Sequence, residues 1–211
     1  MARTGSSRSL VIVDYGTGNL GSVTKVLRSL GIDATVSARP RDVATADKII
    51  LPGIGHFART MEHLNESGML DVLNEFVLAD RKPVLGICLG MELMAERSEE
   101  GDAVGLGWLK GKVEKFRIED KRRFKVPHMG WNQIRIQKPT ALLAGLPTWS
   151  EFYFAHAYHL LLNDACDIVG DTEYETPFPS VIEKGNIFGV QFHPEKSQDA
   201  GRRLLKNFVE I

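Results

Sequence analysis

Short apolar runs alternate with segments of helical spacing through the first half of the chain. Residues 10–13 form an apolar run of the kind found in buried strands of parallel sheets. Apolar residues then recur at helical spacing over 20–30, and Gly31 follows as a helix-ending glycine. The same criteria predict strands at 32–36, 48–51 and 83–87 and helices at 56–65, 69–79 and 89–97. This alternation predicts a parallel sheet with helices on both faces.

The second half of the chain carries a weaker pattern. It predicts strands at 113–116, 133–136, 151–158, 180–183 and 187–192 and a last helix at 200–209. Segment 117–125 contains five basic residues and is interpreted as a solvated turn between strands. We expect one α/β domain over residues 9–211, preceded by a flexible tail at 1–8.

Length, charge and cysteine content narrow the class of protein. A chain of 211 residues suits one α/β domain rather than two. The formal net charge of −1 gives no electrostatic reason to expect a nucleic acid or an anionic membrane as partner. The two cysteines form no CxxC pair and fit a reducing compartment. Because the polar N-terminus lacks a signal-peptide core and no apolar run reaches the ~20 residues of a membrane span, we expect a cytoplasmic protein.

The stretch VLGICLGM at 84–91 is the most informative part of the sequence. An apolar strand ends at Cys88 between Gly86 and Gly90, and a helix is predicted to start at once. This is the spacing of a nucleophile elbow, in which a sharp turn lifts the side chain above the sheet edge and the helix start stabilises a thiolate. The alternative is a buried core cysteine. Cys166 has none of these features and is interpreted as such a core cysteine.

A cysteine nucleophile needs a base, and the base needs a group that orients it. The segment QFHPEKS at 191–197 offers His193 and Glu195, whose side chains would share one face of an extended backbone. The alternative is a surface histidine beside a solvated glutamate. His156 and His159 could begin a zinc site, but no third ligand lies nearby in the sequence, so no metal is predicted.

Three motifs together resemble those of the class I, or triad, glutamine amidotransferases: LPGIG at 51–55, GICLG at 86–90 and FHPEKS at 192–197. The resemblance implies that Cys88 attacks the side-chain amide of glutamine. A thioester then forms, ammonia leaves and water hydrolyses the thioester. It further implies that His193 is the general base and acid and that Glu195 orients it. No cofactor is implied.

The same resemblance implies a flavodoxin-like α/β fold. Its central sheet would be mostly parallel, with helices on both faces and extra antiparallel strands in the second half. The glycine-rich loop matches the family's oxyanion loop, so backbone N–H groups of Gly53, Ile54 and Gly55 are expected at the substrate, together with that of Leu89.

Three further segments are similar to the glutaminase subunits of imidazole glycerol phosphate synthase: VDYGTGNL at 13–20, PHMGWN at 127–132 and YFAHAY at 153–158. This similarity implies a heterodimer with a (β/α)8-barrel cyclase that receives ammonia through an internal channel. The cyclase would use a phosphoribulosyl-formimino carboxamide nucleotide to make imidazole glycerol phosphate for histidine and a carboxamide ribotide for purines. The expected interface residues are Asn19, His128, Met129, Trp131 and Lys196.

Two positions expected to bind substrate depart from the family pattern. Glu92 stands four residues after the nucleophile, where the family usually has glutamine, and Ala157 precedes Tyr158 where serine or threonine is common. Position i+4 of a helix faces the same side as Cys88. A carboxylate there is expected to raise the thiol pKa and to repel the carboxylate of the substrate, although it could meet the substrate's ammonium group.

A third departure is YETPFP at 174–179, which is similar to a paralogous group of subunits. Those paralogues feed ammonia to an amino-sugar-forming partner in surface polysaccharide synthesis, which makes this the alternative pathway. Because of Glu92, a further alternative is a binding subunit without catalytic activity.

Two interpretations from other classes compete with the amidotransferase. The segment GTGNLG at 16–21 matches the glycine pattern of a dinucleotide-binding turn, but the acidic residue expected after the next strand is missing. A general cysteine hydrolase or chaperone-like protein could share the topology. The His–Glu spacing of FHPEKS argues against it.

Overall fold

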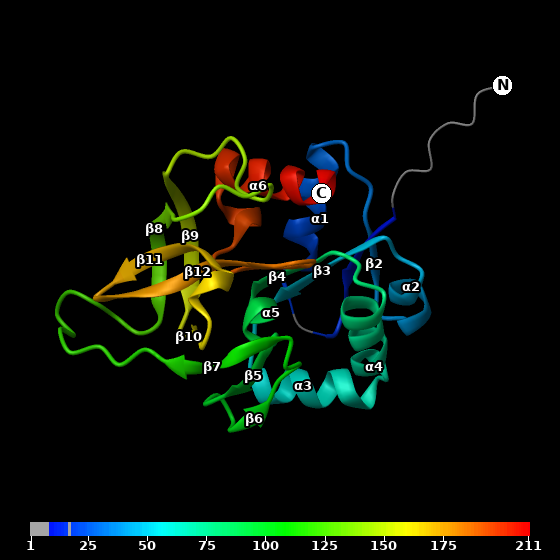
Figure 1. The fold of residues 1–211 in the computed structure, drawn as a ribbon, viewed down its shortest axis with the longest axis horizontal. Helices are drawn as coiled ribbons and strands as arrows, with labels where there is room; N and C mark the ends of the chain where they lie inside the picture. Colours follow the sequence, from blue (N-terminus) through cyan, green and yellow to red (C-terminus); the bar gives the residue numbers. More distant parts are fainter. Residues whose placement is uncertain (1–8, 17) are drawn as a thin grey trace.

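The computed structural model describes residues 9–16 and 18–211, which form two sheets and the helices around them (Figure 1). The large sheet contains, in spatial order, β2 (Thr35–Ser37), β1 (Leu10–Val13), β3 (Lys48–Gly53), β4 (Val84–Cys88), β13 (Ile187–Val190), β12 (Thr176–Lys184), β11 (Ile168–Tyr174), β8 (His128–Ile136) and β9 (Trp149–His156). The small sheet contains β10 (Tyr158–Leu162), β7 (Leu109–Lys115), β5 (Ala95–Ser98) and β6 (Ala103–Val104). The tail predicted at 1–8 lies outside the described residues.

The helices connect these strands and close the chain. They are α1 (Leu20–Ser29), α2 (Pro40–Ala44), α3 (Phe57–Glu66), α4 (Met69–Asn74) with its π-helical continuation η1 (Glu75–Ala79), α5 (Leu89–Glu92), the 3-10 turns η2 (Ala165–Asp167) and η3 (Pro194–Lys196), and α6 (Gln198–Glu210). Among the described residues, no helix combines the length and the apolar character needed to cross a membrane.

The large sheet is parallel on one side and antiparallel on the other. Strands β2, β1, β3, β4 and β13 pair in parallel, whereas β12, β11, β8 and β9 pair with their neighbours antiparallel. All residues of β1, β3, β4 and β13 are buried, as expected for strands covered on both faces. The predicted α/β fold with added antiparallel strands is therefore confirmed.

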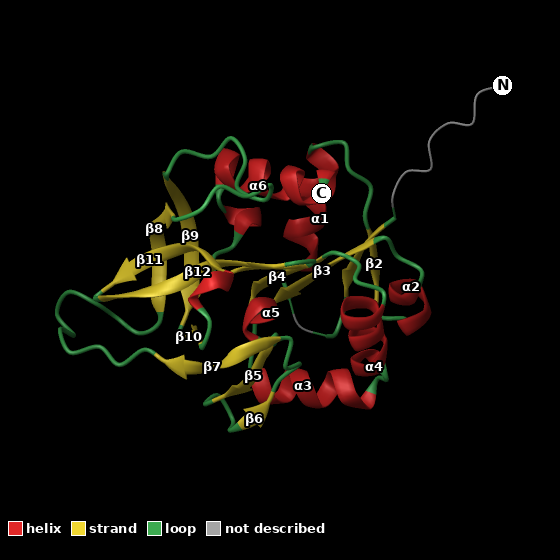
Figure 2. Ribbon diagram, viewed as in Figure 1, coloured by secondary structure: helices red, strands yellow, loops and turns green. Residues whose placement is uncertain are grey.

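A separate apolar cluster lies on each face of the parallel strands. One contains Val23 and Leu27 of α1 with Leu204 and Phe208 of α6. The other contains Phe57 of α3 and further residues of α3 and α4. The ribbons place α1 and α6 above the sheet and α3 and α4 below it (Figure 2). This layering leaves the carboxyl ends of β3 and β4 free to carry a site.

The prediction of a helix over residues 89–97 is wrong. Helix α5 ends at Glu92, the chain turns, and β5 then pairs with β7 and β6 in the small sheet. The reason is tertiary, because Ala95 is fully buried there while the following charged residues reach solvent. The pattern also missed α2, β6, β10 and β11, and the second strand is shorter than predicted.

Candidate active site

Cys88 stands at the junction of β4 and α5, where the predicted strand-to-helix turn is present. It is the last residue of the strand and the N-cap of the helix, with φ 53° and ψ −113°. A positive φ is uncommon for a residue with a side chain and is retained where the surroundings enforce it. The residue is buried in this turn, with 5 % of its surface exposed.

Three glycines allow the backbone to pack tightly around this turn. A Cβ on Gly86 would lie 2.6 Å from the carbonyl oxygen of Gly90, and a Cβ on Gly53 would lie 2.7 Å from the Cβ of Leu89. A Cβ on Gly90 would overlap the carbonyl oxygen of Leu51 in β3. The elbow therefore depends on close contact between α5, β4 and β3.

We expect Gly90→Ala to destabilise the fold by about 3 kcal/mol or more, since backbone must move to admit the methyl group. Gly21 in α1 is the matched control, because an added Cβ would find no described atom within 4 Å. Gly21→Ala should be neutral or stabilising by up to about 1 kcal/mol. Urea unfolding of both variants measures the difference, and equal midpoints would contradict the packing argument.

His193 and Glu195 lie side by side, both with nearly buried side chains. The Nδ1 atom of His193 is 2.9 Å from Oε1 of Glu195. The extended backbone predicted for this pair is wrong beyond His193, because Pro194–Lys196 forms a 3-10 turn. That turn, closed by hydrogen bonds from the Ser197 N–H to Pro194 and from the Ser197 hydroxyl to His193, brings the carboxylate back to the ring.

Strand β9 places Cys88 and His193 along one edge. The His193 N–H donates to the Tyr153 carbonyl at 2.8 Å, and the Cys88 Sγ lies 4.0 Å from the Ala155 carbonyl two residues further along. Among the described residues, Nε2 of His193 is buried and has no hydrogen-bond partner. Because a Glu195 carboxylate can only accept, Nδ1 carries the proton and Nε2 presents a lone pair.

The thiol of Cys88 is held in its neutral form by its surroundings. Burial raises its pKa well above the usual value, and the nearby carboxyls of Glu92 and Glu195 raise it further. The Leu89 N–H and the Gln191 amide act in the opposite direction. A thiol in this state needs a base to remove its proton when it reacts.

A pocket of about 180 Å³ opens in front of Cys88. Six of the residues predicted to bind substrate line it: Ile54, Gly55, Leu89, Glu92, Ala157 and Tyr158. Gly53 lies behind them, paired with Cys88 across β3 and β4. The pocket is also lined by residues that sequence reasoning missed: Glu100, Pro127, Ala155 and His156. The pocket therefore brings most of the predicted substrate-binding residues together around Cys88.

Two further residues, which the sequence analysis did not predict, contact the site. The Tyr15 hydroxyl is buried and donates to the Pro52 carbonyl at 2.5 Å, so it holds the start of the glycine-rich loop. The Gln191 amide lies 4.0 Å from the Cys88 sulfur. Both follow the ends of strands in the parallel part of the sheet, which is the signal that could have found them.

His128, one of the predicted interface residues, is buried in this chain. It is 3 % exposed, and its ring stacks on Phe154 and Tyr174. Its Nδ1 lies 3.1 Å from Nε2 of His156, whose Nδ1 lies 2.7 Å from the Tyr158 carbonyl. Burial lowers the pKa of His128 to about 4 and that of His156 well below its usual value, so this histidine pair is neutral.

The other predicted interface residues are accessible to different degrees. Met129 is 65 % exposed and Trp131 is 48 % exposed, which excludes a core role for the indole. Lys196 is exposed, with its Nζ 5.6 Å from the Tyr153 ring, while Asn19 is half-buried. Met129 also lines the pocket of Cys88, so the exposed Met129 side chain lies at the pocket's opening.

Cys166 is exposed in η2, so its interpretation as a core cysteine is wrong. The turn at Asp164 holds it at the surface, where the Cys166 N–H donates to the Asp164 carboxylate. Its pKa is raised by that carboxylate, which makes it a poor nucleophile. Within the described part of the chain, no cluster of three or more His, Cys, Asp or Glu residues could hold a metal ion.

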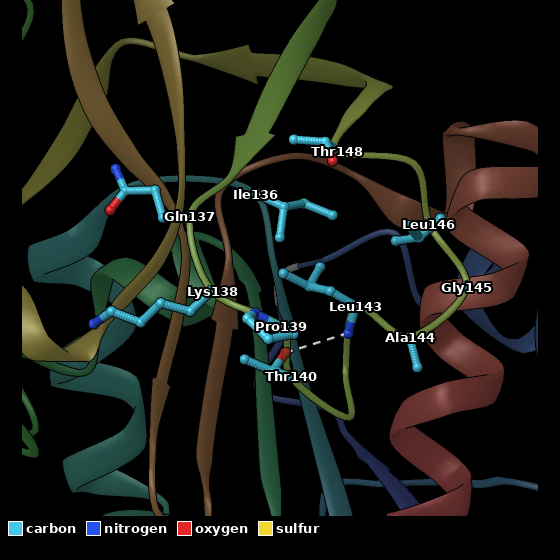
Figure 3. A pocket seen from close by; sticks show the side chains of 10 residues that line it. All are labelled: Ile136, Gln137, Lys138, Pro139, Thr140, Leu143, Ala144, Gly145, Leu146 and Thr148. Atoms are coloured by element: carbon cyan, nitrogen blue, oxygen red, sulfur yellow. Dashed lines mark hydrogen bonds between the residues drawn. The ribbon is translucent and has the colours of Figure 1, made fainter.

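A larger hollow of about 320 Å³ lies away from the cysteine, between the end of β8 and the loop before β9 (Figure 3). Its wall includes Ile136, Leu143 and Leu146, and the Thr140 hydroxyl accepts a hydrogen bond from the Leu143 N–H at 3.4 Å. The Lys138 side chain points away from the hollow and donates to the Cys166 carbonyl. This lining offers no acid–base or nucleophilic pair.

Cys88 at the elbow and His193, which pairs with Glu195, both contact strand β9. Comparison with known proteins shows the family. The family description "Glutamine amidotransferase class-I" matches residues 11–211. The chain therefore belongs to the class I glutamine amidotransferases.

Three relatives all carry the name imidazole glycerol phosphate synthase subunit HisH. HisH 2 of Methanococcus maripaludis is 44 % identical over 95 % of this chain and 98 % of its own length. HisH 2 of Pseudomonas aeruginosa is 45 % identical, covering 96 % and 99 %. HisH of Moorella thermoacetica is 45 % identical, covering 97 % and 95 %.

Solved structures agree on the fold. A crystal structure of a glutamine amidotransferase aligns with a TM-score of 0.74 at 19 % identity, covering 95 % of this chain and 97 % of the other. PurLQS from Thermotoga maritima aligns with a TM-score of 0.71 at 17 % identity, covering 97 % and 99 %. At such low identity the likeness concerns the fold alone.

Proposed function

We propose that this chain is the glutaminase subunit of an imidazole glycerol phosphate synthase. It would release ammonia from glutamine and pass it to a (β/α)8-barrel cyclase, in the cytoplasm, where both described cysteines stay free thiols. The observation that carries the proposal is the His193–Glu195 pair, held at the same strand β9 that the elbow cysteine contacts, in a chain 44–45 % identical to three HisH subunits.

The proposed reaction begins when the Cys88 sulfur attacks the side-chain amide carbon of glutamine. The thiol proton passes to Nε2 of His193, whose lone pair has no other partner among the described residues. Glu195 stabilises the imidazolium through Nδ1 at 2.9 Å. His193 then returns the proton to the leaving nitrogen, ammonia departs, and a water activated by the same ring hydrolyses the thioester to glutamate.

Backbone N–H groups would stabilise the negative oxygen that forms in each tetrahedral intermediate. The Leu89 N–H, at the start of α5, already faces the Cys88 sulfur closely enough to lower its pKa. Ile54 and Gly55 also line the pocket and are the proposed second source of donors. The Tyr15 hydroxyl fixes the carbonyl at the base of that loop.

Met129, Trp131 and Lys196 are proposed to contact the cyclase, since all three are exposed. Met129 lines the pocket, while Trp131 and Lys196 both lie against the Tyr153 ring. Asn19, at the start of α1, is proposed at the edge of the same surface. A partner that covers the opening of the pocket would keep water out and receive the ammonia directly.

Glutamate release from glutamine tests the proposal, measured for the chain alone and with the barrel cyclase from the same cell. We expect a rate that rises sharply with the partner, together with formation of imidazole glycerol phosphate by the pair. A pair that binds but releases no glutamate would favour the silent subunit. A pair that releases glutamate without making that product would contradict the histidine pathway.

The second candidate is an amidotransferase subunit for amino-sugar formation, favoured by the segment YETPFP at 174–179. Tyr174 stacks on His128 at a centroid distance of 4.0 Å, and the Glu175 carboxylate accepts from the N–H groups of Glu119 and Asp120. The segment that departs from the family pattern therefore forms part of the surface beside Trp131. Ammonia transfer to an amino-sugar-forming partner, with none to the cyclase, would select this candidate.

A further inference from the structure

Glu92 is a carboxyl group buried inside the proposed catalytic pocket. Only 4 % of the residue is exposed, and it lines the pocket next to Cys88. In the described part of the chain, no lysine, arginine or histidine forms an ion pair with it. A buried carboxylate without a cation is strongly disfavoured, so the geometry favours the neutral acid.

One hydrogen-bond partner connects Glu92 to the nucleophile. The Gln191 Nε2 atom donates to Oε1 of Glu92 at 2.7 Å and lies 4.0 Å from the sulfur of Cys88. An amide nitrogen carries two hydrogens, so the bond to Glu92 directs the second toward the sulfur. If the amide were reversed, its oxygen would face the sulfur and oppose the thiolate.

His156 lines the same pocket as Glu92, but burial lowers its pKa and keeps it neutral. The other titratable groups around Glu92 are acids. They are Cys88 at the end of β4, Tyr15 after β1, Glu100 after β5 and Tyr158 at the start of β10. Loss of a proton from Glu92 would therefore add negative charge to a pocket that contains no described compensating cation. The thiol of Cys88 would respond most, because thiolate and carboxylate would share one small space.

We propose that Glu92 is a positioning residue that works as a neutral acid: it holds the Gln191 amide with its NH₂ toward Cys88, and its ionisation suppresses the thiolate. The effect on turnover rests on the proposed glutaminase function, whereas the effect on the thiol does not. Burial raises the pKa of Glu92 to about 8, so it is neutral at pH 7 and ionises as the pH rises through about 8.

The first test measures the alkylation rate of Cys88 by iodoacetamide against pH, in the full chain with Cys166→Ser to remove the exposed thiol. Glu92→Gln keeps the acceptor for Gln191 but cannot ionise. Above pH about 8, where Glu92 of the parent is ionised, it should lower the thiol pKa by about one unit and give about tenfold faster alkylation while both thiols are still mostly protonated. At pH 7, where Glu92 is neutral, the two rates should agree. Glu62→Gln removes an exposed carboxyl of α3 and should leave the profile unchanged. Identical profiles for Glu92→Gln and the parent would overturn the proposal, as would an equal shift in Glu62→Gln.

The second test separates charge from anchoring by glutamate release with the cyclase partner. Glu92→Leu also removes the charge but cannot hold Gln191. Its kcat should fall at least several-fold below that of Glu92→Gln, with the thiol pKa lowered in both. Equal kcat values would overturn the anchoring role. If the alkylation shift is found but no form hydrolyses glutamine, the proposed function fails while the influence of Glu92 on the thiol stands.

Discussion

Cys88→Ala is expected to abolish glutamine hydrolysis, lowering kcat by about a thousandfold or more. The thiol lines the proposed catalytic pocket and contacts strand β9, to which the proposed base His193 also hydrogen-bonds. Removal of the nucleophile leaves only binding and oxyanion stabilisation, which do not replace covalent catalysis. Glutamate release in the presence of the cyclase partner is the measurement.

The same variant should fold and bind its partner normally. Alanine at the elbow keeps a β-carbon at φ 53°, so it neither relieves nor adds backbone strain there. Cys166→Ala is the matched control: it removes an exposed thiol and should leave the rate unchanged. Substantial hydrolysis by Cys88→Ala, or a comparable loss in Cys166→Ala, would contradict the assigned nucleophile.

The fold and the proposed triad could be predicted because their signals are local. An apolar run that ends at Cys88 between two glycines specifies a strand, a tight turn and a helix start within a few residues. His193 and Glu195 are neighbours in sequence, so their contact needs only a suitable turn. The predicted contact between the two side chains is present, but the predicted extended backbone is not. A 3-10 turn brings the two side chains together as well as a strand would.

The remaining differences between expectation and structure concern features that depend on distant parts of the chain. Helical spacing continues after Glu92, but β7 offers a strand partner and the chain leaves the helix to form β5. His128 is polar and lies in a motif associated with the interface, yet the aromatic rings of Phe154 and Tyr174 enclose it. The proximity of Tyr15 to the glycine-rich loop likewise follows only from the order of strands in the sheet.

His193→Ala should lose most of the rate, with kcat lowered by about 10²- to 10⁴-fold, because the neutral thiol of Cys88 would have no base. Glu195→Gln should cost less, since the amide oxygen can still accept from Nδ1 at the same position and only the charge that stabilises the imidazolium is lost. His63→Ala, an exposed histidine of α3, is the control and should be silent.

The order of these losses is the informative result of steady-state kinetics with the cyclase partner. A larger loss in Glu195→Gln than in His193→Ala would mean that the carboxylate, not the imidazole, takes the thiol proton. The buried Oε2 atom of Glu195, which has no partner among the described residues, would then become the candidate base. The opposite order fits a base whose lone pair is presented at Nε2 because its other nitrogen is bound to Glu195.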